Sequence, residues 1–156
     1  MARTVMIFNN PTLKVADTEL GLATGTAVEC QVTSARVTVA PVYNEIPATG
    51  CSGASQSPGL SGYALDLAWL DDWTVDGLSQ FAWQNDGKEV WFELTPDTAV
   101  AAQKITGHAY ASAGGYGGTF GDGSAAVSTA TWPCVEKPVV PAPVVAAAEA
   151  PVAETV

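Results

Sequence analysis

Apolar residues at every second position constrain this chain more than any other feature. They recur on one parity in two segments, at Tyr63, Leu65, Leu67 and Trp69 and again at Val90, Phe92 and Leu94. Because the side chains of a β-strand point alternately to opposite faces of its sheet, each segment predicts a strand with one face in a core. Weaker versions of the pattern predict further strands at 4–8, 12–16, 26–41, 103–112 and 124–132.

The segment 26–41 changes parity within its length. Val28, Cys30 and Val32 share one parity, whereas Val37 and Val39 have the opposite one. One inserted residue moves every later side chain to the other face of a sheet, so the change predicts a β-bulge or a bend near Ser34. The alternation also predicts that Cys30 is a small core residue.

One helix is expected after the strand that ends near residue 70. Asp76 is its expected N-cap, Leu78, Phe81 and Ala82 follow at helical spacing, and "NDG" at 85–87 supplies the turn that ends it. Strands with a single helix predict a mainly β fold, an antiparallel β-sandwich or barrel with one flanking α-helix. An apolar stripe on the helix would cover an open end or edge of the sandwich.

The segment 42–62 predicts a long loop that reaches another subunit. It is rich in Gly, Pro, Ser and Asn, and it is longer than the ~12–15 residues beyond which loops are mostly functional or disordered. Its glycines allow a long hairpin between strands that end near Ala40 and start near Tyr63. The expected anchors on a neighbouring subunit are Val42, Tyr43, Ile46 and Leu60. A disordered surface loop is the alternative interpretation.

The end of the chain is of low complexity. Pro, Ala and Val dominate residues 139–156, with no periodic apolar face. Such a composition is typical of an extended tail, so the expected organisation is one β domain at 1–138 followed by a flexible tail at 139–156.

Composition limits the classes of function. Charged residues make up 14% of the chain, below the ~25% of ordinary domains, which indicates either a surface that other subunits cover or a Gly/Ala/Thr-rich domain whose surface is merely neutral. The net charge of −10 argues against a protein that grips nucleic acid, because phosphate binding needs Lys and Arg. No run of about 18 apolar residues predicts a membrane span, and the polar start of the chain does not resemble a signal peptide.

The residues that carry chemistry do not form a catalytic or metal-binding pattern. His108 is the one histidine, and Cys30, Cys51 and Cys134 lack the spacing of a zinc site. The acidic residues at 71, 72 and 76 do not match an EF-hand and are better explained as charges near a helix N-terminus. The glycine-rich segment 114–123 lacks the GK[ST] ending of a phosphate-binding loop. We therefore expect no enzyme, no cofactor and no metal.

Several short motifs together resemble the major tail (tail tube) proteins of long-tailed double-stranded DNA bacteriophages. They are "DW" at 72–73, "GLSQFAW" at 77–83, "NDG" at 85–87, "VWFEL" at 90–94 and "WPCVEKP" at 132–138. The resemblance spans roughly 26–138 and depends on the order and spacing of the motifs. The chain departs from the family in being short and in ending in a Pro/Ala/Val tail.

The resemblance implies a structural virion protein assembled in the host cytoplasm. Family subunits form hexameric rings that stack into a hollow tube, and DNA leaves the capsid through it without specific binding. The implied partners are other copies of the chain, a tape-measure protein, a tail terminator and tail-tip proteins. A bore that DNA passes should be acidic or neutral, and the candidate bore-facing residues are Glu29, Gln31, Thr33, Glu89 and Glu93.

Two other functions stay open at this point. One is a different virion part, either a tail terminator or a capsid decoration protein. The other is a carbohydrate-binding β-sandwich, for which Trp69 and Trp91 are candidate stacking platforms, although Trp69 shares its parity with Leu65 and Leu67 and is better explained as core.

Overall fold

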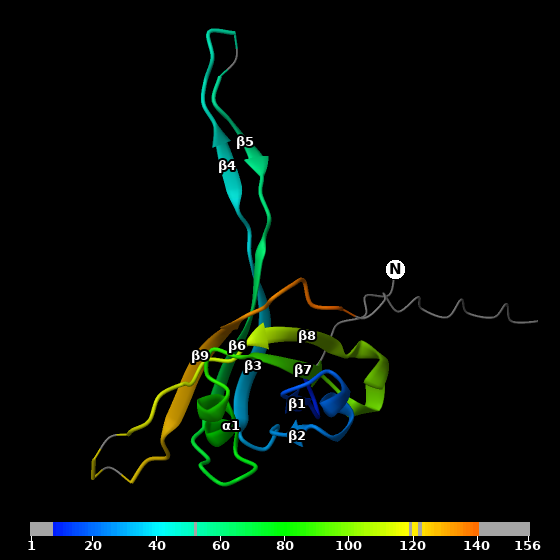
Figure 1. Cartoon of the computed structure of the whole chain (residues 1–156), viewed down its shortest axis with the longest axis vertical. Coiled ribbons are helices and arrows are strands. Elements are labelled where there is room, and N and C mark those ends of the chain that lie inside the picture. The colour runs from blue at the N-terminus through cyan, green and yellow to red at the C-terminus, as the bar shows by residue number, and fades with distance from the viewer. Residues whose placement is uncertain (1–7, 52, 119, 122, 141–156) are drawn as a thin grey trace, which may run out of the picture.

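The alternating segments form the strands of two antiparallel sheets, and a long hairpin projects from one end of the molecule (Figure 1). The computed structural model describes residues 8–51, 53–118, 120, 121 and 123–140, apart from the side chains of residues 100–102. A four-stranded sheet has the order β2-β1-β7-β8, a three-stranded sheet has the order β3-β6-β9, and β4 pairs with β5. The expected mainly β, antiparallel fold with one α-helix is confirmed, and the arrangement is a sandwich without a closed barrel.

The elements follow one another with short connections. The strands are β1 (Thr12–Ala16), β2 (Thr26–Ala27), β3 (Val32–Ala40), β4 (Tyr43–Ile46), β5 (Ser55–Pro58), β6 (Gly62–Leu70), β7 (Glu89–Thr95), β8 (Ile105–Tyr110) and β9 (Val127–Pro133). The helix α1 is Leu78–Gln84, and two 3₁₀ helices, η1 (Leu20–Thr24) and η2 (Thr98–Gln103), had no counterpart in the sequence pattern. The strand expected at 4–8 lies almost entirely outside the described residues.

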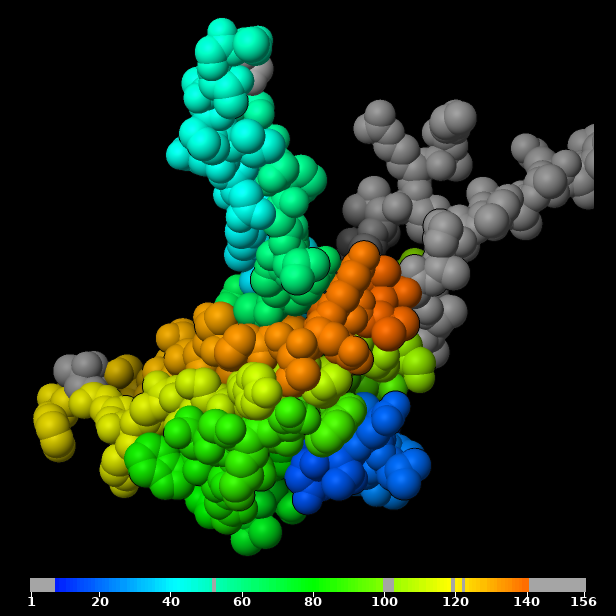
Figure 2. All heavy atoms as spheres, turned by 45° about the horizontal axis from the view of Figure 1, so that its top comes forward, coloured from blue at the N-terminus to red at the C-terminus, as the bar shows by residue number. Residues whose placement is uncertain are grey.

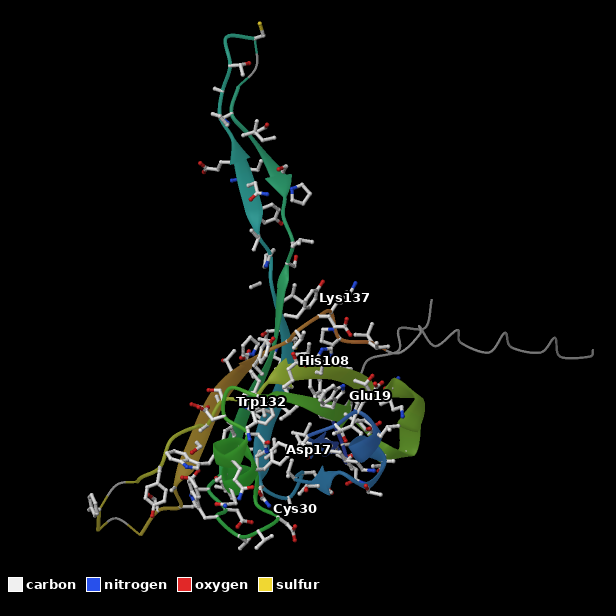
Figure 3. The ribbon with its side chains drawn as sticks, viewed as in Figure 1. Asp17, Glu19, Cys30, His108, Trp132 and Lys137 are labelled. Atoms are coloured by element: carbon white, nitrogen blue, oxygen red, sulfur yellow. The ribbon has the colours of Figure 1, made fainter. Side chains whose placement is uncertain are left out.

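The core lies between the two sheets and is built from the predicted parities. It contains Leu13 and Val15 of β1, Val90, Phe92 and Leu94 of β7, Leu65, Leu67 and Trp69 of β6, and Trp132 of β9. Trp69 and Trp132, the latter labelled in Figure 3, are the largest fully buried side chains. The inward faces predicted for β6 and β7 are thus confirmed.

The two sheets are joined along one side by the chain that follows β9. The backbone N–H of Val135 donates to the carbonyl of His108 at 3.0 Å, and Thr106 and Val139 exchange two backbone hydrogen bonds at 3.0 and 2.8 Å. Val139 therefore belongs to the paired part of the chain, one residue beyond the expected end of the domain at 138. Residues 141–156, most of the expected tail, lie outside the described part.

The bulge expected near Ser34 is confirmed, but the expected continuous strand before it is not. The register passes from Val32↔Trp69 to Ser34↔Ala68, which leaves Thr33 as the extra residue. Residues 28–31 form a turn, closed by a hydrogen bond of 3.0 Å from Gln31 N–H to the Val28 carbonyl. The chain turns here because it leaves the four-stranded sheet at β2 and enters the three-stranded sheet at β3.

The prediction that Cys30 is a core residue is wrong, because the turn exposes it. Figure 3 shows Cys30 at the end of the molecule opposite the hairpin. Val28, the first residue of the turn, is fully buried, and its N–H still donates to the Leu13 carbonyl of β1 at 2.9 Å.

The N-cap of the helix lies one residue later than predicted. Gly77 is the N-cap and Asp76 is exposed, so the prediction for Asp76 is wrong. Gly77 packs so closely on Asp72 that a Cβ atom would lie 2.1 Å from the Asp72 carbonyl oxygen. The side chain of Gln31 supplies the missing cap, since its Oε1 accepts a hydrogen bond of 2.7 Å from Leu78 N–H.

The expected hairpin between Ala40 and Tyr63 is present and is a continuation of β3 and β6. Ala40 pairs with Gly62, Gly59 N–H donates to the Val42 carbonyl at 2.7 Å, and Tyr43 pairs with Pro58 in β4–β5. The space-filling view shows that the hairpin stands clear of the body above its base (Figure 2). We call residues 41–61 the arm.

No helix in the described part of the chain combines the length and the apolar character that crossing a membrane requires.

The packing of α1 generates the first prediction. Leu78 is fully buried, so Leu78→Ala should cost about 2–5 kcal/mol of unfolding free energy, whereas Phe81→Ala should cost less because Phe81 is only half-buried. Chemical denaturation followed by tryptophan fluorescence measures both. Val75→Ala is the control, because Val75 is exposed and should change stability by no more than about 0.5 kcal/mol. Equal losses for Leu78→Ala and Val75→Ala would contradict this packing.

Candidate functional site

Large exposed apolar side chains gather at the two ends of the molecule. At one end is the arm, where the four predicted anchors are all exposed: Val42, Tyr43, Ile46 and Leu60. At the other end, where Figure 1 shows α1 and the loop that leads into β9, the exposed side chains include Trp83, Tyr116 and Phe120. Monomeric proteins seldom expose such groups together without a binding role, so both ends are candidate interaction surfaces.

The register of the arm sorts its side chains onto two faces. Tyr43 is opposite Pro58 and Glu45 is opposite Gln56, so these four share one face. Leu60 lies between β5 and β6, where three residues (59–61) stand opposite two (41 and 42), and it is 95% exposed. The other face carries Val42, Asn44, Ile46, Ser55 and Ser57. The structure thus places Tyr43 on one face of the arm and Val42 with Ile46 on the other, whereas Leu60 lies at the base of the arm, outside β5.

Four aromatic residues, Trp73, Trp83, Tyr116 and Phe120, form the second surface, which we call the aromatic cluster. The ring centroid of Trp73 lies 5.9 Å from that of Trp83 and 4.9 Å from that of Tyr116, with interplanar angles of 64° and 85°. These edge-on contacts are favourable for aromatic pairs. Trp73, Tyr116 and Phe120 also line an open hollow of about 450 Å³ together with Asp71, Gly117, Gly118 and Ala126.

A buried polar network fixes the base of the aromatic cluster. Ser79 Oγ of α1 accepts a hydrogen bond of 2.9 Å from Trp69 Nε1 and donates one of 3.3 Å to Asp71 Oδ1. Ser128 Oγ of β9 donates to the same carboxylate oxygen. Gly114 packs directly on the Trp69 ring, where a Cβ atom would be 2.7 Å from the ring carbon Cη2. One carboxylate therefore holds β6, α1 and β9 together beneath the cluster.

The acidic residues before α1 do not lie in its first turn. Asp71 bonds Ser79 and Ser128, and the first turn of the helix contains no acidic residue. Asp72 Oδ1 accepts a hydrogen bond of 2.9 Å from Thr74 N–H, and this bond, followed by one from the Thr74 side chain, lowers the pKa of Asp72. The interpretation of this acidic stretch as charges at a helix N-terminus is wrong, because the chain turns between Asp72 and Gly77 before the helix begins.

The five candidate bore-facing residues do not share one surface. Glu29 and Gln31 lie in the turn 28–31 and not on a strand face, so the strand parity from which they were predicted does not exist. Gln31 caps α1, and one carboxylate oxygen of Glu29 is buried without a hydrogen-bond partner among the described residues. Thr33 sits on the bulge and donates to the Ala68 carbonyl at 3.0 Å.

Glu89 and Glu93 lie apart from that group, on the outer face of β7 in the four-stranded sheet. Glu93 forms an ion pair of 3.1 Å with Lys104, and Glu89 accepts a hydrogen bond of 3.4 Å from the Tyr110 hydroxyl. Both carboxylates therefore already have partners on neighbouring elements of the same sheet.

The outer edges of the three-stranded sheet are β3 and β9, and among the described residues neither strand pairs with a further strand, although Cys134, directly after β9, forms a bridge with Ala109 of β8. Its outward face carries mostly Thr and Ala side chains around one Arg–Asp pair, with Leu70 opposite Val127 at one end. Asp66 lies at its centre, directly across from Arg36, and accepts hydrogen bonds of 3.0 Å from Thr38 and 2.7 Å from Thr131. Free edges offer backbone N–H and C=O groups to another chain.

His108 lies on the outer face of β8 and is half-buried. Its ring stacks on Trp91, with centroids 5.4 Å apart, and its Nδ1 lies 3.7 Å from Glu136 Oε1. Trp91 is thus partly covered by His108, and Trp69 is fully buried, so neither offers an open platform for a sugar ring. The described residues contain no group of three His, Cys, Asp or Glu side chains placed to hold a metal ion.

Comparison with family models and with curated proteins yields no match.

The three cysteines give a direct test of these surfaces. Cys51 at the tip of the arm and Cys30 in the turn 28–31 are exposed, whereas burial raises the pKa of Cys134 to about 11. Because the thiolate is the reactive form, a maleimide at pH 8 should modify Cys30 and Cys51 quickly and Cys134 slowly. Mass spectrometry should find two rapid additions per chain, and Cys30→Ser should reduce them to one. Three equally rapid additions would show that the chain after β9 is not packed on β8.

Proposed function

We propose that the chain is a structural subunit of a phage tail tube, which stacks as rings into the hollow tube that conducts DNA. The arm is the observation that carries this proposal. In an isolated subunit, a hairpin with exposed apolar side chains would be unfavourable. Ordering its backbone costs about 1–2 kcal/mol of conformational entropy per residue, and no packing in the same subunit offsets that cost. A neighbouring subunit supplies that packing.

The free edges of the three-stranded sheet support the ring. When β3 of one copy pairs with β9 of the next, the contact is heterologous and repeats around a closed ring. Each such pairing covers backbone groups that would otherwise recruit chains at random. The arm extends β3 and β6 beyond the body, so it lies at the right place to leave one ring for another (Figure 1).

A ring of this kind turns the outward face of the three-stranded sheet toward the bore. This face carries Asp66 and Arg36 opposite each other, among Thr and Ala side chains, so it offers no basic strip on which DNA phosphates would bind. The net charge of −10 adds a repulsive field around it. Glu89 and Glu93 then lie on the outside of the tube, and a reconstruction with these two in the bore would reverse the assignment.

The proposal predicts polymers of uniform width. Negative-stain electron microscopy of the purified chain should show tubes, and sedimentation should show species far larger than a dimer. A population of single rings that never stack would instead favour a tail terminator. Monomers at every concentration tested would contradict any ring-forming role.

The arm generates a separate prediction. Replacing residues 44–58 with a short Gly/Ser turn should leave a folded subunit that forms monomers or single rings and no tubes, because the body packs without the arm. Circular dichroism confirms folding, and electron microscopy measures assembly. Normal tubes from this variant would show that stacking depends on another surface.

A further inference from the structure

We propose that the aromatic cluster of one copy is the docking site for the arm of a second copy. This inference rests on the proposed function and identifies the partner surface of the arm. Its components are Tyr43 and Pro58 on one face of the arm, with the exposed Leu60 at the base of the arm, and the hollow lined by Trp73, Tyr116 and Phe120.

The two surfaces lie at opposite ends of the same chain. Figure 1 shows the arm at one end and the loop 114–126 with α1 at the other, and Figure 2 shows the body between them. An arm therefore cannot reach its own aromatic cluster. A contact between two different surfaces of one chain is heterologous, and when it does not close on itself it generates an open polymer.

The chemistry of the two surfaces is complementary. The arm offers two rigid apolar side chains, Pro41 and Pro58, and one branched apolar side chain, Leu60. Tyr43 adds an aromatic ring with a polar hydroxyl group. Grooves lined by aromatic residues recognise proline-containing extended segments in this way, because proline rings pack flat on aromatic faces at little cost in conformational entropy. Gly117 and Gly118 leave one wall of the hollow without side chains, so the backbone of a hairpin can approach it.

The receiving surface is held in place before docking. Trp73 is flanked edge-on by Trp83 and Tyr116, and the Asp71 carboxylate ties α1 and β9 together beneath it. A site that is already ordered loses less entropy when it binds, so a modest apolar contact area is enough for specific docking.

Charge gives the contact a salt dependence. Glu45 is the one carboxylate in the arm and shares the face of Tyr43, while Asp72 and Asp76 flank Trp73 in the chain. These groups repel one another weakly, and salt screens that repulsion while leaving the apolar contact intact. Stacking through this contact should therefore become stronger as salt rises from low to physiological concentration, whereas a contact made by ion pairs would weaken.

Substitutions on the receiving surface test the inference without touching the arm. Tyr116 is 79% exposed and Phe120 is fully exposed, so Tyr116→Ser with Phe120→Ser should leave the fold unchanged. The concentration needed for tubes should rise by at least about tenfold, the loss expected for a central aromatic anchor. The matched control is Leu20→Ser, an equally exposed apolar residue in η1, which should form tubes as the unsubstituted chain does.

Cross-linking identifies the contact directly. A benzophenone amino acid at position 60, in a mixture of ¹⁴N- and ¹⁵N-labelled chains, should give adducts between copies after illumination. Trypsin releases the arm in the peptide 37–88 and Tyr116 with Phe120 in the peptide that begins at Ile105, so the expected product joins these two peptides with mixed isotopes.

The outcomes separate the two proposals. If the unsubstituted chain forms no tubes, the proposed function fails, and mixed-isotope adducts to the peptide from Ile105 would still support the docking contact. If tubes form equally well from Tyr116→Ser with Phe120→Ser, the docking contact is wrong and the tube proposal stands. A mixed-isotope adduct at Trp73 or Trp83, which lie in the peptide 37–88 of the second copy, would also support the contact. Mixed-isotope adducts confined to residues away from the aromatic cluster, or adducts only within one chain, overturn it.

Discussion

The pairing of β3 with β6 is the constraint on which the rest of the structure depends. It places Leu65, Leu67 and Trp69 in the core, and the same two strands continue as the arm. This ladder fixes Ala40 against Gly62, the point at which the arm leaves the body. A shift of one residue in the ladder would expose the core parity of β6 and move the point at which the arm leaves the body. Stability and assembly geometry are therefore coupled through one strand pair.

Strand periodicity predicts the core-facing residues correctly wherever a strand has one buried face. The inward residues of β6 and β7, the bulge at Thr33 and the bounds of the long hairpin were all predictable, because each depends on alternation or on a run of glycines that permits a turn. The same rule failed at residues 28–31. Their alternation is that of a strand, but the chain must cross there from one sheet to the other, and only the three-dimensional layout of the two sheets imposes that turn. Glu29, Gln31 and Cys30 were misplaced together for this single reason.

The aromatic cluster could not be predicted from the sequence. Trp73, Tyr116 and Phe120 lie in loops without periodicity, more than forty positions separate the first of them from the other two, and each alone is an ordinary loop aromatic. What brings them together is a polar interaction, the shared hydrogen bonding of Asp71 with Ser79 and Ser128. Asp and Ser residues that lie far apart in the sequence form no periodic pattern from which such hydrogen bonds could be predicted. The same limit applies to Gln31, a residue from another element that caps α1 in place of the expected neighbour Asp76.

A chain with a net charge of −10 resists polymerisation, since every added copy brings more like charge. Assembly then requires short-range contacts that do not depend on charge. The apolar surfaces at the two ends of this molecule, the arm and the aromatic cluster, supply such contacts. The arm carries one carboxylate among apolar and small polar residues, and the aromatic cluster is uncharged except for acids at its margin. Repulsion between the negatively charged copies acts at long range and opposes disordered aggregation. Apolar docking acts only at short range, when an arm meets an aromatic cluster in the right orientation. The acidic composition thus favours ordered stacking over random association, and it leaves few cations on which passing DNA would be held.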